Sequence, residues 1–435
     1  MTSTTPDAPT VIATAPMTFG QMSVWRDIDK LPKHRWHEPN VAHHFALPRP
    51  VSRRQLAEAL TRIEAKHEAV RTVFDVNDPI HPTQQLLSPQ PVEDVETVFT
   101  GPDRVEELTL DFKGRPFDLR TDRGFRVLAF ADGAETDDLD AVNVRELAFS
   151  VHHLTADGWS LGLLMTDLFA FLDIGGEELP PAPSSLIEIA NEQRSAPVWQ
   201  AKLKATQKHF RAVYETEPAE FRDRDPEQTV LNCALESRLL CTAGRTLADR
   251  YKVSMATVFT AGFLDAVAGF CTPGSIRVGL MTSNRFLERW RNQVTTMNQL
   301  IPMLADADPG LDFAERIART QVATMRAFRL GLFDPDQVTP QALGLSAEST
   351  QLYSLCMVNF SNGVPVEIVD PETPGEPPMV HWEPAFSKIA RSCYLRVHET
   401  TGDTLRLRLR TGELPAEVAE AILRNTYQRV LDAAG

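Results

Sequence analysis

A change of hydrophobic period between residues 147 and 171 constrains the fold more than any other feature of this chain. Over 147–151, Leu, Phe and Val alternate with Ala and Ser, which is the pattern of a half-buried strand. Apolar residues then recur at helical spacing, at Leu161, Leu164, Leu168 and Phe171. The sequence therefore predicts a strand and then a helix, joined by a tight turn.

The turn carries two adjacent histidines followed by an Asp-Gly pair. Because successive strand side chains point to opposite faces of a sheet, we expect His152 and His153 to point in opposite directions, one to the core and one to a cavity. A histidine with an ordinary pKa of about 6.5 can accept a proton at neutral pH. Gly158 opens the predicted helix, where unpaired backbone N–H groups favour negative charge. A second pair, His43-His44, has no Asp-Gly after it and is interpreted as surface or packing histidine.

This pattern resembles that of a known family. Residues 152–158 are similar to the HHxxxDG signature of nonribosomal peptide synthetase condensation domains, which share a superfamily with chloramphenicol acetyltransferase. Residues 17–25 and 66–72 are similar to the first two motifs of these domains, with Lys and Val in place of the usual Arg and Leu in the second. The resemblance extends from Met17 to the end of the chain. It implies an α/β fold of two chloramphenicol-acetyltransferase-like lobes that form a V, with an active-site tunnel between them.

The resemblance also implies a role for each residue of the turn. His153 is expected in the cavity, as the base that accepts the proton of the incoming amine or as a hydrogen-bond acceptor that positions it. His152 is expected to support the turn. The backbone N–H of Gly158 is the expected oxyanion donor, and the missing side chain leaves room for the thioester carbonyl. Asp157 is expected to form a buried ion pair with Arg285 that shapes the turn and takes no part in the chemistry.

Candidates outside the turn have weaker support. The segment 357–363 resembles the family's strand that lines the acceptor side of the cavity, so Asn359 or Ser361 is a candidate for orienting the nucleophile. A polar cluster that makes a turn at a strand end is the alternative. Ser160 is interpreted as a packing or capping residue, because no base sits at a suitable offset. His67, in the second motif, is interpreted as bracing the junction between a helix and a strand.

Composition and resemblance together divide the chain into four parts. Residues 1–16 are rich in Thr, Ala and Pro and are expected to form a disordered leader. Residues 17–174 form the predicted N-terminal lobe. A Pro-rich linker and a crossing helix are expected over 175–196, because consecutive prolines cannot continue a helix. The predicted second lobe, 197–435, contains helices near 255–270 and 415–431 and strands at 276–280, 393–397 and 405–410.

Charge and cysteine content exclude several classes of function. A net charge of −15 disfavours binding to nucleic acid and to anionic membrane surfaces. The sequence has no run of about 18 apolar residues that would predict a transmembrane helix. The five cysteines show no metal-ligand spacing, so we expect no metal site. Buried, reduced thiols are typical of a cytoplasmic protein, and we expect a cytoplasmic monomer.

Taken together, the resemblance implies a free-standing condensation enzyme of secondary-metabolite biosynthesis. The expected reaction moves an acyl or aminoacyl group from the phosphopantetheine thioester of a carrier protein, supplied in trans, to a small-molecule or carrier-bound amine. A hydroxyl acceptor, giving an ester, is the second choice. No bound cofactor is expected. Two alternatives stay open, namely a coenzyme A-dependent acyltransferase and a non-catalytic docking module that keeps the fold.

Overall fold

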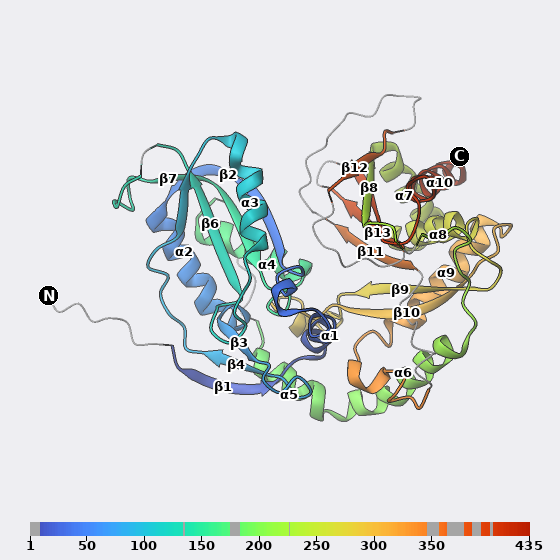
Figure 1. The fold of residues 1–435 in the computed structure, drawn as a ribbon, viewed down its shortest axis with the longest axis horizontal. Coiled ribbons are helices and arrows are strands. Elements are labelled where there is room, and N and C mark those ends of the chain that lie inside the picture. The colour runs from blue at the N-terminus through green and yellow to red at the C-terminus, as the bar shows by residue number, and fades with distance from the viewer. Residues whose placement is uncertain are drawn as a thin grey trace. The chain divides into compact units, whose positions relative to one another are not determined.

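The chain divides into two compact units (Figure 1). The computed structural model describes residues 9–133, 135–174, 183–225, 227–345, 356–362, 378–384, 393–400 and 403–435. The first unit comprises Met1–Gln200 and Ser283–Asn298, and the second comprises Ala201–Thr282 and Gln299–Gly435. The sequence predicts a continuous second lobe from residue 197. The return of Ser283–Asn298 to the first unit corrects that boundary.

The first unit contains two sheets with helices around them. The four-stranded sheet has the order β2-β7-β6-β5, and the three-stranded sheet has the order β1-β4-β3. The strands are β1 (Val11–Pro16), β2 (Val41–Ser52), β3 (Thr72–Asp75), β4 (Thr83–Leu87), β5 (Glu96–Phe99), β6 (Phe125–Ala131) and β7 (Asn143–Val151). The helices are α1 (Phe19–Ile28), α2 (Arg53–Lys66), α3 (Val105–Gly114), α4 (Gly158–Phe171) and α5 (Leu186–Ser195).

Strand β1 lies within the residues for which the sequence predicts a disordered leader. Val11–Pro16 pairs antiparallel with β4, with Ala13 opposite Leu86 and Ala15 opposite Gln84. The prediction of disorder is therefore wrong for residues 11–16. Residues 1–8 lie outside the described residues, as does the Pro-rich part of the predicted linker, 175–182.

Strand β7, which ends at the histidine turn, is buried on both faces. Leu147, Phe149 and Val151 belong to the core shared with α2 and α4. On the other face, Ala148 packs with Phe112 of α3. The sequence predicts a half-buried strand from the alternation of large and small residues. Over residues 147–151 the strand is instead buried on both faces, because α3 covers the face that carries the small side chains.

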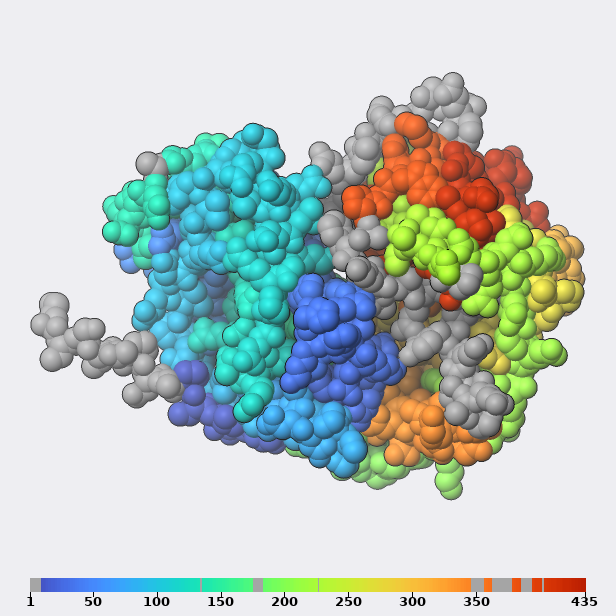
Figure 2. Space-filling model, viewed as in Figure 1, coloured from blue at the N-terminus to red at the C-terminus, as the bar shows by residue number. Residues whose placement is uncertain are grey.

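Helix α1 and the residues that follow it support the turn from one side. They form the dark blue surface near the centre of Figure 2. Trp36 in this segment packs edge-on against Trp25 of α1, with ring centroids 5.4 Å apart. Both belong to a small core that also contains Leu154 of the turn. The turn is therefore packed against a core as well as hydrogen bonded.

The second unit is built on one seven-stranded sheet of order β10-β9-β11-β13-β14-β8-β12. Its strands are β8 (Leu231–Ser237), β9 (Ser275–Thr282), β10 (Gln299–Asp306), β11 (Cys356–Asn362), β12 (His381–Glu383), β13 (Cys393–Glu399) and β14 (Leu405–Thr411). Its helices are α7 (Arg238–Tyr251), α8 (Met255–Ala268), α9 (Phe313–Phe328) and α10 (Ala416–Ala434), and α6 (Pro197–Glu215) leads into it from the first unit.

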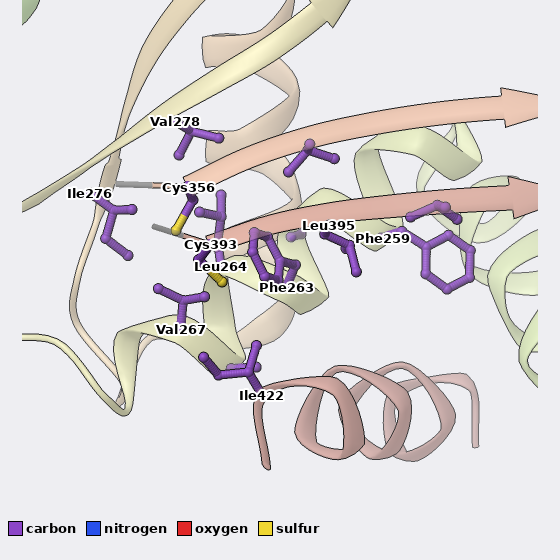
Figure 3. Close-up of a cluster of buried hydrophobic side chains, with 14 of the residues drawn as sticks. Phe259, Phe263, Leu264, Val267, Ile276, Val278, Cys356, Cys393, Leu395 and Ile422 are labelled. Atoms are coloured by element: carbon purple, nitrogen blue, oxygen red, sulfur yellow. The ribbon is translucent and has the colours of Figure 1, made fainter. Parts of the chain in front are cut away.

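One face of this sheet forms the largest core of the protein. Figure 3 shows side chains of β9, β11 and β13 packed against helices α8 and α10, among them Val278, Cys356, Cys393, Leu395, Phe263, Leu264 and Ile422. All five cysteines are buried free thiols, as the sequence predicts. Along β13 and β14 the residues that alternate with this core point to the opposite face and are mostly polar, among them Arg396, His398, Arg406 and Arg408.

Candidate active site

The turn between β7 and α4 is fixed by backbone hydrogen bonds and one close approach. The N–H of His152 donates to the carbonyl of Gly124 at 2.9 Å, and the N–H of Thr155 donates to the carbonyl of His152 at 2.9 Å. A Cβ added to Gly124 would lie 1.7 Å from Oγ1 of Thr155. Position 124 therefore requires glycine so that the turn can pack on the neighbouring strand.

His152 is a buried, neutral histidine. Its side chain packs edge-on against Phe117, with ring centroids 5.9 Å apart, and its Nδ1 accepts a hydrogen bond from the N–H of Leu154 at 3.2 Å. Burial, with a smaller contribution from the charge of His153, lowers the pKa of His152 to about 3. A group that stays neutral and enclosed at physiological pH supports the turn, in agreement with the predicted role.

His153 lies on the exposed side of the same turn and is only partly buried, whereas His152 is 1% exposed. The hydroxyl of Thr296 donates a hydrogen bond to the backbone carbonyl of His153 and lies 3.5 Å from its Nδ1. The two histidines thus differ in environment as the alternation of strand side chains predicts. Thr296 therefore holds the backbone of His153 and lies close to its ring.

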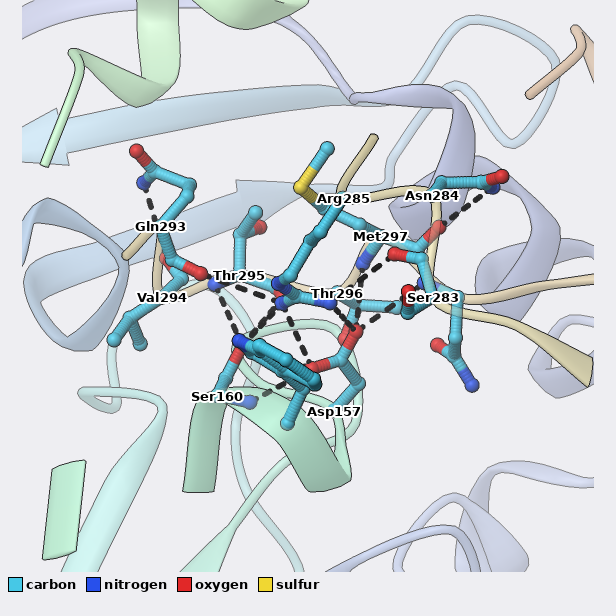
Figure 4. Close-up of polar contacts among 12 residues, drawn as sticks. Asp157, Ser160, Ser283, Asn284, Arg285, Gln293, Val294, Thr295, Thr296 and Met297 are labelled. Atoms are coloured by element: carbon cyan, nitrogen blue, oxygen red, sulfur yellow. Dashed lines mark hydrogen bonds and ion pairs between the residues drawn. The ribbon is translucent and has the colours of Figure 1, made fainter. Parts of the chain in front are cut away.

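Asp157 and Arg285 form the buried ion pair that the sequence predicts (Figure 4). Nη1 of Arg285 lies 2.8 Å from Oδ2 of Asp157, and Nη2 lies 2.9 Å from Oδ1. Both side chains are 2% exposed. Two parallel hydrogen bonds between a guanidinium and a carboxylate fix the orientation of both groups.

The carboxylate of Asp157 also organises the helix start and a distant loop. Oδ1 accepts from the N–H of Ser160 at 2.9 Å, which makes Asp157 the N-cap of α4. Oδ2 accepts from the N–H groups of Met297 and Asn298 at 3.1 and 3.2 Å. Burial alone would raise the pKa of Asp157, but the charge and hydrogen bonds of Arg285 outweigh it and lower the pKa. Asp157 is therefore an ionised structural centre.

Ser160 is fully engaged in the same network. Its Oγ accepts from Nη2 of Arg285 at 2.8 Å and from the N–H of Thr295 at 3.0 Å, and it lies 2.7 Å from the carbonyl oxygen of Thr295. The residue is completely buried. These contacts support the interpretation of Ser160 as a capping and packing residue.

Gly158 is the first residue of α4 and is exposed to solvent. Its backbone N–H belongs to the first turn of the helix, which has no acceptor within the helix. Its φ is not in the left-handed region, and a Cβ added here would meet no atom within 4 Å. Neither backbone conformation nor packing within the protein requires glycine at this position. Gly158 is distinguished instead by its place at the N-terminus of α4, with open space beside it.

Trp159 covers the ion pair on the outer side. Its indole Nε1–H donates to the carbonyl of Arg291 at 2.9 Å, and its ring centroid lies 5.9 Å from Cζ of Arg285. The side chain is nevertheless 52% exposed. Trp159 therefore shields the ion pair and leaves one side of its ring in contact with solvent.

The second motif that resembles the family, residues 66–72, contributes contacts that hold helices together. His67 Nε2 and Lys66 Nζ both contact the carboxylate of Asp167 on α4, at 2.6 and 2.8 Å. His67 is 2% exposed, and burial lowers its pKa in spite of the hydrogen bond to Asp167. His67 therefore ties the end of α2 to α4 through Asp167, which supports its interpretation as a brace.

The two acceptor-side candidates lie in the second unit, inside strand β11. Asn359 and Ser361 point to the polar face of the sheet. Nδ2 of Asn359 lies 3.4 Å from the hydroxyl of Tyr394, and Oγ of Ser361 lies 2.6 Å from Nδ1 of His398. Both are part of a regular strand paired with β13, and Ser361 lies one residue before the end of that strand.

Sequence reasoning missed two residues that shape the site. Thr296 contacts His153 across 143 positions of sequence. Asn284 precedes Arg285 with a φ of 54°, and its Nδ2 donates to the carbonyl of Met297 at 2.9 Å. Asn is one of the few residues that tolerates the left-handed region, and this property was the only local signal for its role.

Neither a membrane helix nor a metal cluster is found in the part of the chain that the structure describes. None of the described helices combines the length and the apolar character that a bilayer crossing requires. No group of three or more His, Cys, Asp or Glu side chains among the described residues is arranged to hold a metal ion.

Comparison with known proteins gives a consistent result. Residues 13–342 match the family model of the condensation domain. The chain is 28% identical over 253 residues to the nonribosomal peptide synthetase dtxS1 of Metarhizium robertsii, which is 54% of this chain and 3% of that protein. It is 26% identical over 339 residues to the phosphinothricin tripeptide synthetase PhsC of Streptomyces viridochromogenes, which is 72% of this chain and 29% of that protein. The chain thus spans only a small part of each relative.

Solved structures show the same fold. The structure that explains condensation domain-mediated chain release from the enacyloxin polyketide synthase aligns with a TM-score of 0.74 at 18% identity, over 99% of this chain and 84% of that one. The X-domain bound to OxyB from teicoplanin biosynthesis aligns with a TM-score of 0.73 at 18% identity, over 100% and 96%. These likenesses confirm the predicted α/β fold class of chloramphenicol-acetyltransferase-like lobes.

Proposed function

The chain belongs to the condensation-domain family, and on that premise we propose that it forms an amide by acyl transfer from a carrier-bound thioester to an amine. Condensation domains act on substrates held by the phosphopantetheine arm of carrier proteins and need no cofactor of their own. The finer proposal is that this chain accepts a carrier protein in trans, and that the turn at residues 152–158 is its catalytic site.

This proposal rests mainly on one observation. The turn at residues 152–158 contains side chains that are buried and held by hydrogen bonds next to groups that are accessible. His152 and Asp157 are buried and fixed by hydrogen bonds. His153 is accessible, and Gly158 offers a helix N-terminus beside open space. A rigid frame that presents one imidazole and one set of N–H groups to solvent is what acyl transfer requires.

The proposed reaction assigns one task to each group. His153 accepts a proton from the amine as its nitrogen attacks the thioester carbonyl and the new C–N bond forms. The negative charge that develops on the carbonyl oxygen is stabilised by the N-terminal N–H groups of α4, beginning with Gly158. The C–S bond then breaks, and the thiolate of the phosphopantetheine arm takes the proton from His153. The products are an amide and a free thiol.

In this proposal the Asp157–Arg285 pair fixes the position of the catalytic groups and takes no part in proton transfer. It holds the first residues of α4 and the loop at 295–298 through one carboxylate. The ion pair thereby keeps the N-terminus of α4 in a fixed position relative to His153. On the acceptor side, Asn359 and Ser361 are proposed to orient the nucleophile, because each presents a hydrogen-bonding side chain on the polar face of the sheet.

The test is product formation with defined substrates. The purified chain is incubated with a separately produced carrier protein, loaded with an aminoacyl group on its phosphopantetheine arm, and with candidate amines. Intact-protein mass spectrometry should show loss of the aminoacyl group from the carrier, and amide should appear in solution. Transfer from aminoacyl-coenzyme A at an equal rate would favour the coenzyme A-dependent alternative. Carrier binding without any transfer would favour a docking module.

A further inference from the structure

The face of the second unit's sheet opposite the core has a row of positive charge along β11, β13 and β14. Strands β11, β13 and β14 pair in register, so Asn359, Arg396 and Arg408 lie side by side in one row. The next row contains Ser361, His398 and Arg406. The alternating residues of these strands point into the core, as Figure 3 shows for Cys356 and Leu395.

Among the described residues, Glu383 pairs with both Arg406 and Arg408, and Glu236 pairs with Arg406. Glu383 of β12 contacts Arg406, and its Oε2 lies 2.7 Å from Nε of Arg408. Glu236 of β8 lies 3.4 Å from Arg406. Arg396 forms no ion pair with any of the residues that the structure describes. Its guanidinium instead lies 4.9 Å from the ring centroid of Tyr394.

Two of these arginines occupy directly opposite positions on neighbouring strands. Arg396 stands directly opposite Arg408 in an antiparallel pair, and like charges in that position repel each other. Both side chains are partly withdrawn from water, and the side chain of Arg408 is only 28% exposed. A half-buried guanidinium presents a planar fork of N–H donors that fits a carboxylate or a phosphate with two bonds.

We propose that Arg396, with Arg408 beside it, binds an oxyanion carried by one of the two substrates. The shared chemistry is that of a carboxylate or a phosphate. The proposal rests on the proposed function, since the phosphodiester of a phosphopantetheine arm and the carboxylate of a free amino acid acceptor are the two sources that acyl transfer supplies. Asn359 and Ser361, held by Tyr394 and His398, flank the site with fixed hydrogen-bonding groups.

The first experiment measures binding without catalysis. Thermal unfolding of the full chain is followed during titration with sodium phosphate or with sodium acetate, against sodium chloride at matched ionic strength. The wild-type protein should show a saturable rise of the midpoint with one of the two anions. Arg396→Gln should lose the saturable part. Unfolding in chloride alone gives the baseline midpoint of each protein.

A matched control separates a local site from a general effect of charge. Arg319→Gln removes the same charge from α9, where Arg319 is 53% exposed and paired with Asp306 and Glu315. This variant should respond to the anions like wild type. Arg396→Lys keeps the charge but not the fork and should bind at least about tenfold more weakly. Should Arg396→Gln fail to fold, Arg396→Lys provides the comparison.

The outcomes distinguish this proposal from the proposed function. A response to phosphate alone points to the phosphopantetheine arm, and a response to acetate alone points to an acidic acceptor. Identical responses of wild type and Arg396→Gln to both anions would overturn the proposal. His153→Ala should bind the anion like wild type, so anion binding is tested even where no acyl transfer is found. In an active preparation, Arg396→Gln should raise KM for the anionic substrate by about tenfold or more and leave kcat unchanged.

Discussion

Asp157 and Arg285 are 128 positions apart in the sequence, and their side chains meet in a two-bonded ion pair inside the first unit. The pair is reached because Asn284 turns the chain with a positive φ immediately before Arg285. One carboxylate therefore ties together the start of α4 and the loop that contains Thr296. The carboxylate of the signature aspartate is enclosed in this network, whereas His153 is only partly buried.

Removing either partner of this pair should destabilise the protein strongly. Asp157→Ala and Arg285→Ala should each lower the free energy of unfolding by about 3–5 kcal/mol, because the remaining charge stays buried without its partner. The double variant should lose less than the sum of the two. Urea unfolding measures all three. Asp140→Ala, which breaks an exposed pair with Arg54, should change the stability far less than either variant of the buried pair. Additive losses for Asp157 and Arg285 would contradict the pairing.

The stabilising effect of Asp157 should depend on pH in a defined direction. Its pKa in the folded protein lies below the ordinary value of about 3.9, so its contribution is fully present above that value and is lost as pH falls through the lowered pKa. The difference in unfolding free energy between wild type and Asp157→Asn should therefore be constant from pH 7 to about pH 5 and shrink below about pH 4. Denaturant unfolding at several pH values checks this. A difference that already shrinks near pH 6 would mean that another group dominates.

Gly158→Leu should abolish acyl transfer and leave the fold intact. Leucine has a higher helix propensity than glycine, and its Cβ would meet no protein atom, so the melting temperature should not fall. Gly162→Leu is the matched control, because Gly162 lies on the same helix, is exposed and has equally open surroundings. Activity and melting are measured for both variants. Normal transfer by Gly158→Leu would place the thioester carbonyl elsewhere.

His153→Ala should slow amide formation by about 10²- to 10⁴-fold without unfolding the protein. His44→Ala is the control, since His44 belongs to the other His-His pair and contacts Glu146 on the surface. The rate is measured with loaded carrier protein and with amines of different basicity. A wild-type rate in a folded His153→Ala protein would remove the assignment of the base. A loss confined to weakly basic amines would indicate positioning instead.

Thr296→Val should affect the rate more than the stability. Valine has nearly the same shape but cannot donate a hydrogen bond to the carbonyl of His153, so the imidazole loses its support. We expect a destabilisation of about 1 kcal/mol and a fall in kcat with little change in KM. Thr295→Val, which removes a contact with Gln21, should cost similar stability without loss of kcat. Equal rates for the two variants would show that Thr296 has no positioning role.

Sequence reasoning identified those parts of the structure that follow from local periodicity. The predicted helix after the turn is α4, and the predicted strands at 276–280, 393–397 and 405–410 are β9, β13 and β14. The pairing of Asp157 with Arg285 came from the family resemblance and is present. Each of these features could be predicted because a regular hydrophobic pattern or a motif within a short stretch of the sequence indicates it.

The features that were missed depend on contacts between distant segments. Strand β1 is rich in small residues and Pro, and it is ordered only because β4 pairs with it. The segment Ser283–Asn298 joins the first unit through Arg285 and its neighbours. No local sequence pattern predicts this assignment. Nothing in the sequence around Thr296 distinguishes it from other threonines, because its contact with His153 exists only in the folded structure. In each case the partner lies far away in the sequence, so local composition gave the wrong expectation or none.

The return of Ser283–Asn298 to the first unit has a consequence for synthesis on the ribosome. The histidine turn is translated long before Arg285, so during that interval the carboxylate of Asp157 has no counter-ion, and burying it unpaired is unfavourable. The first unit can reach its final state only after the chain has entered the second unit and returned from it through Ser283–Asn298. Vectorial folding, in which an N-terminal domain is finished before the next begins, does not apply here. A chain stalled before residue 285 would hold both histidines of the turn without the ion pair that sets its shape.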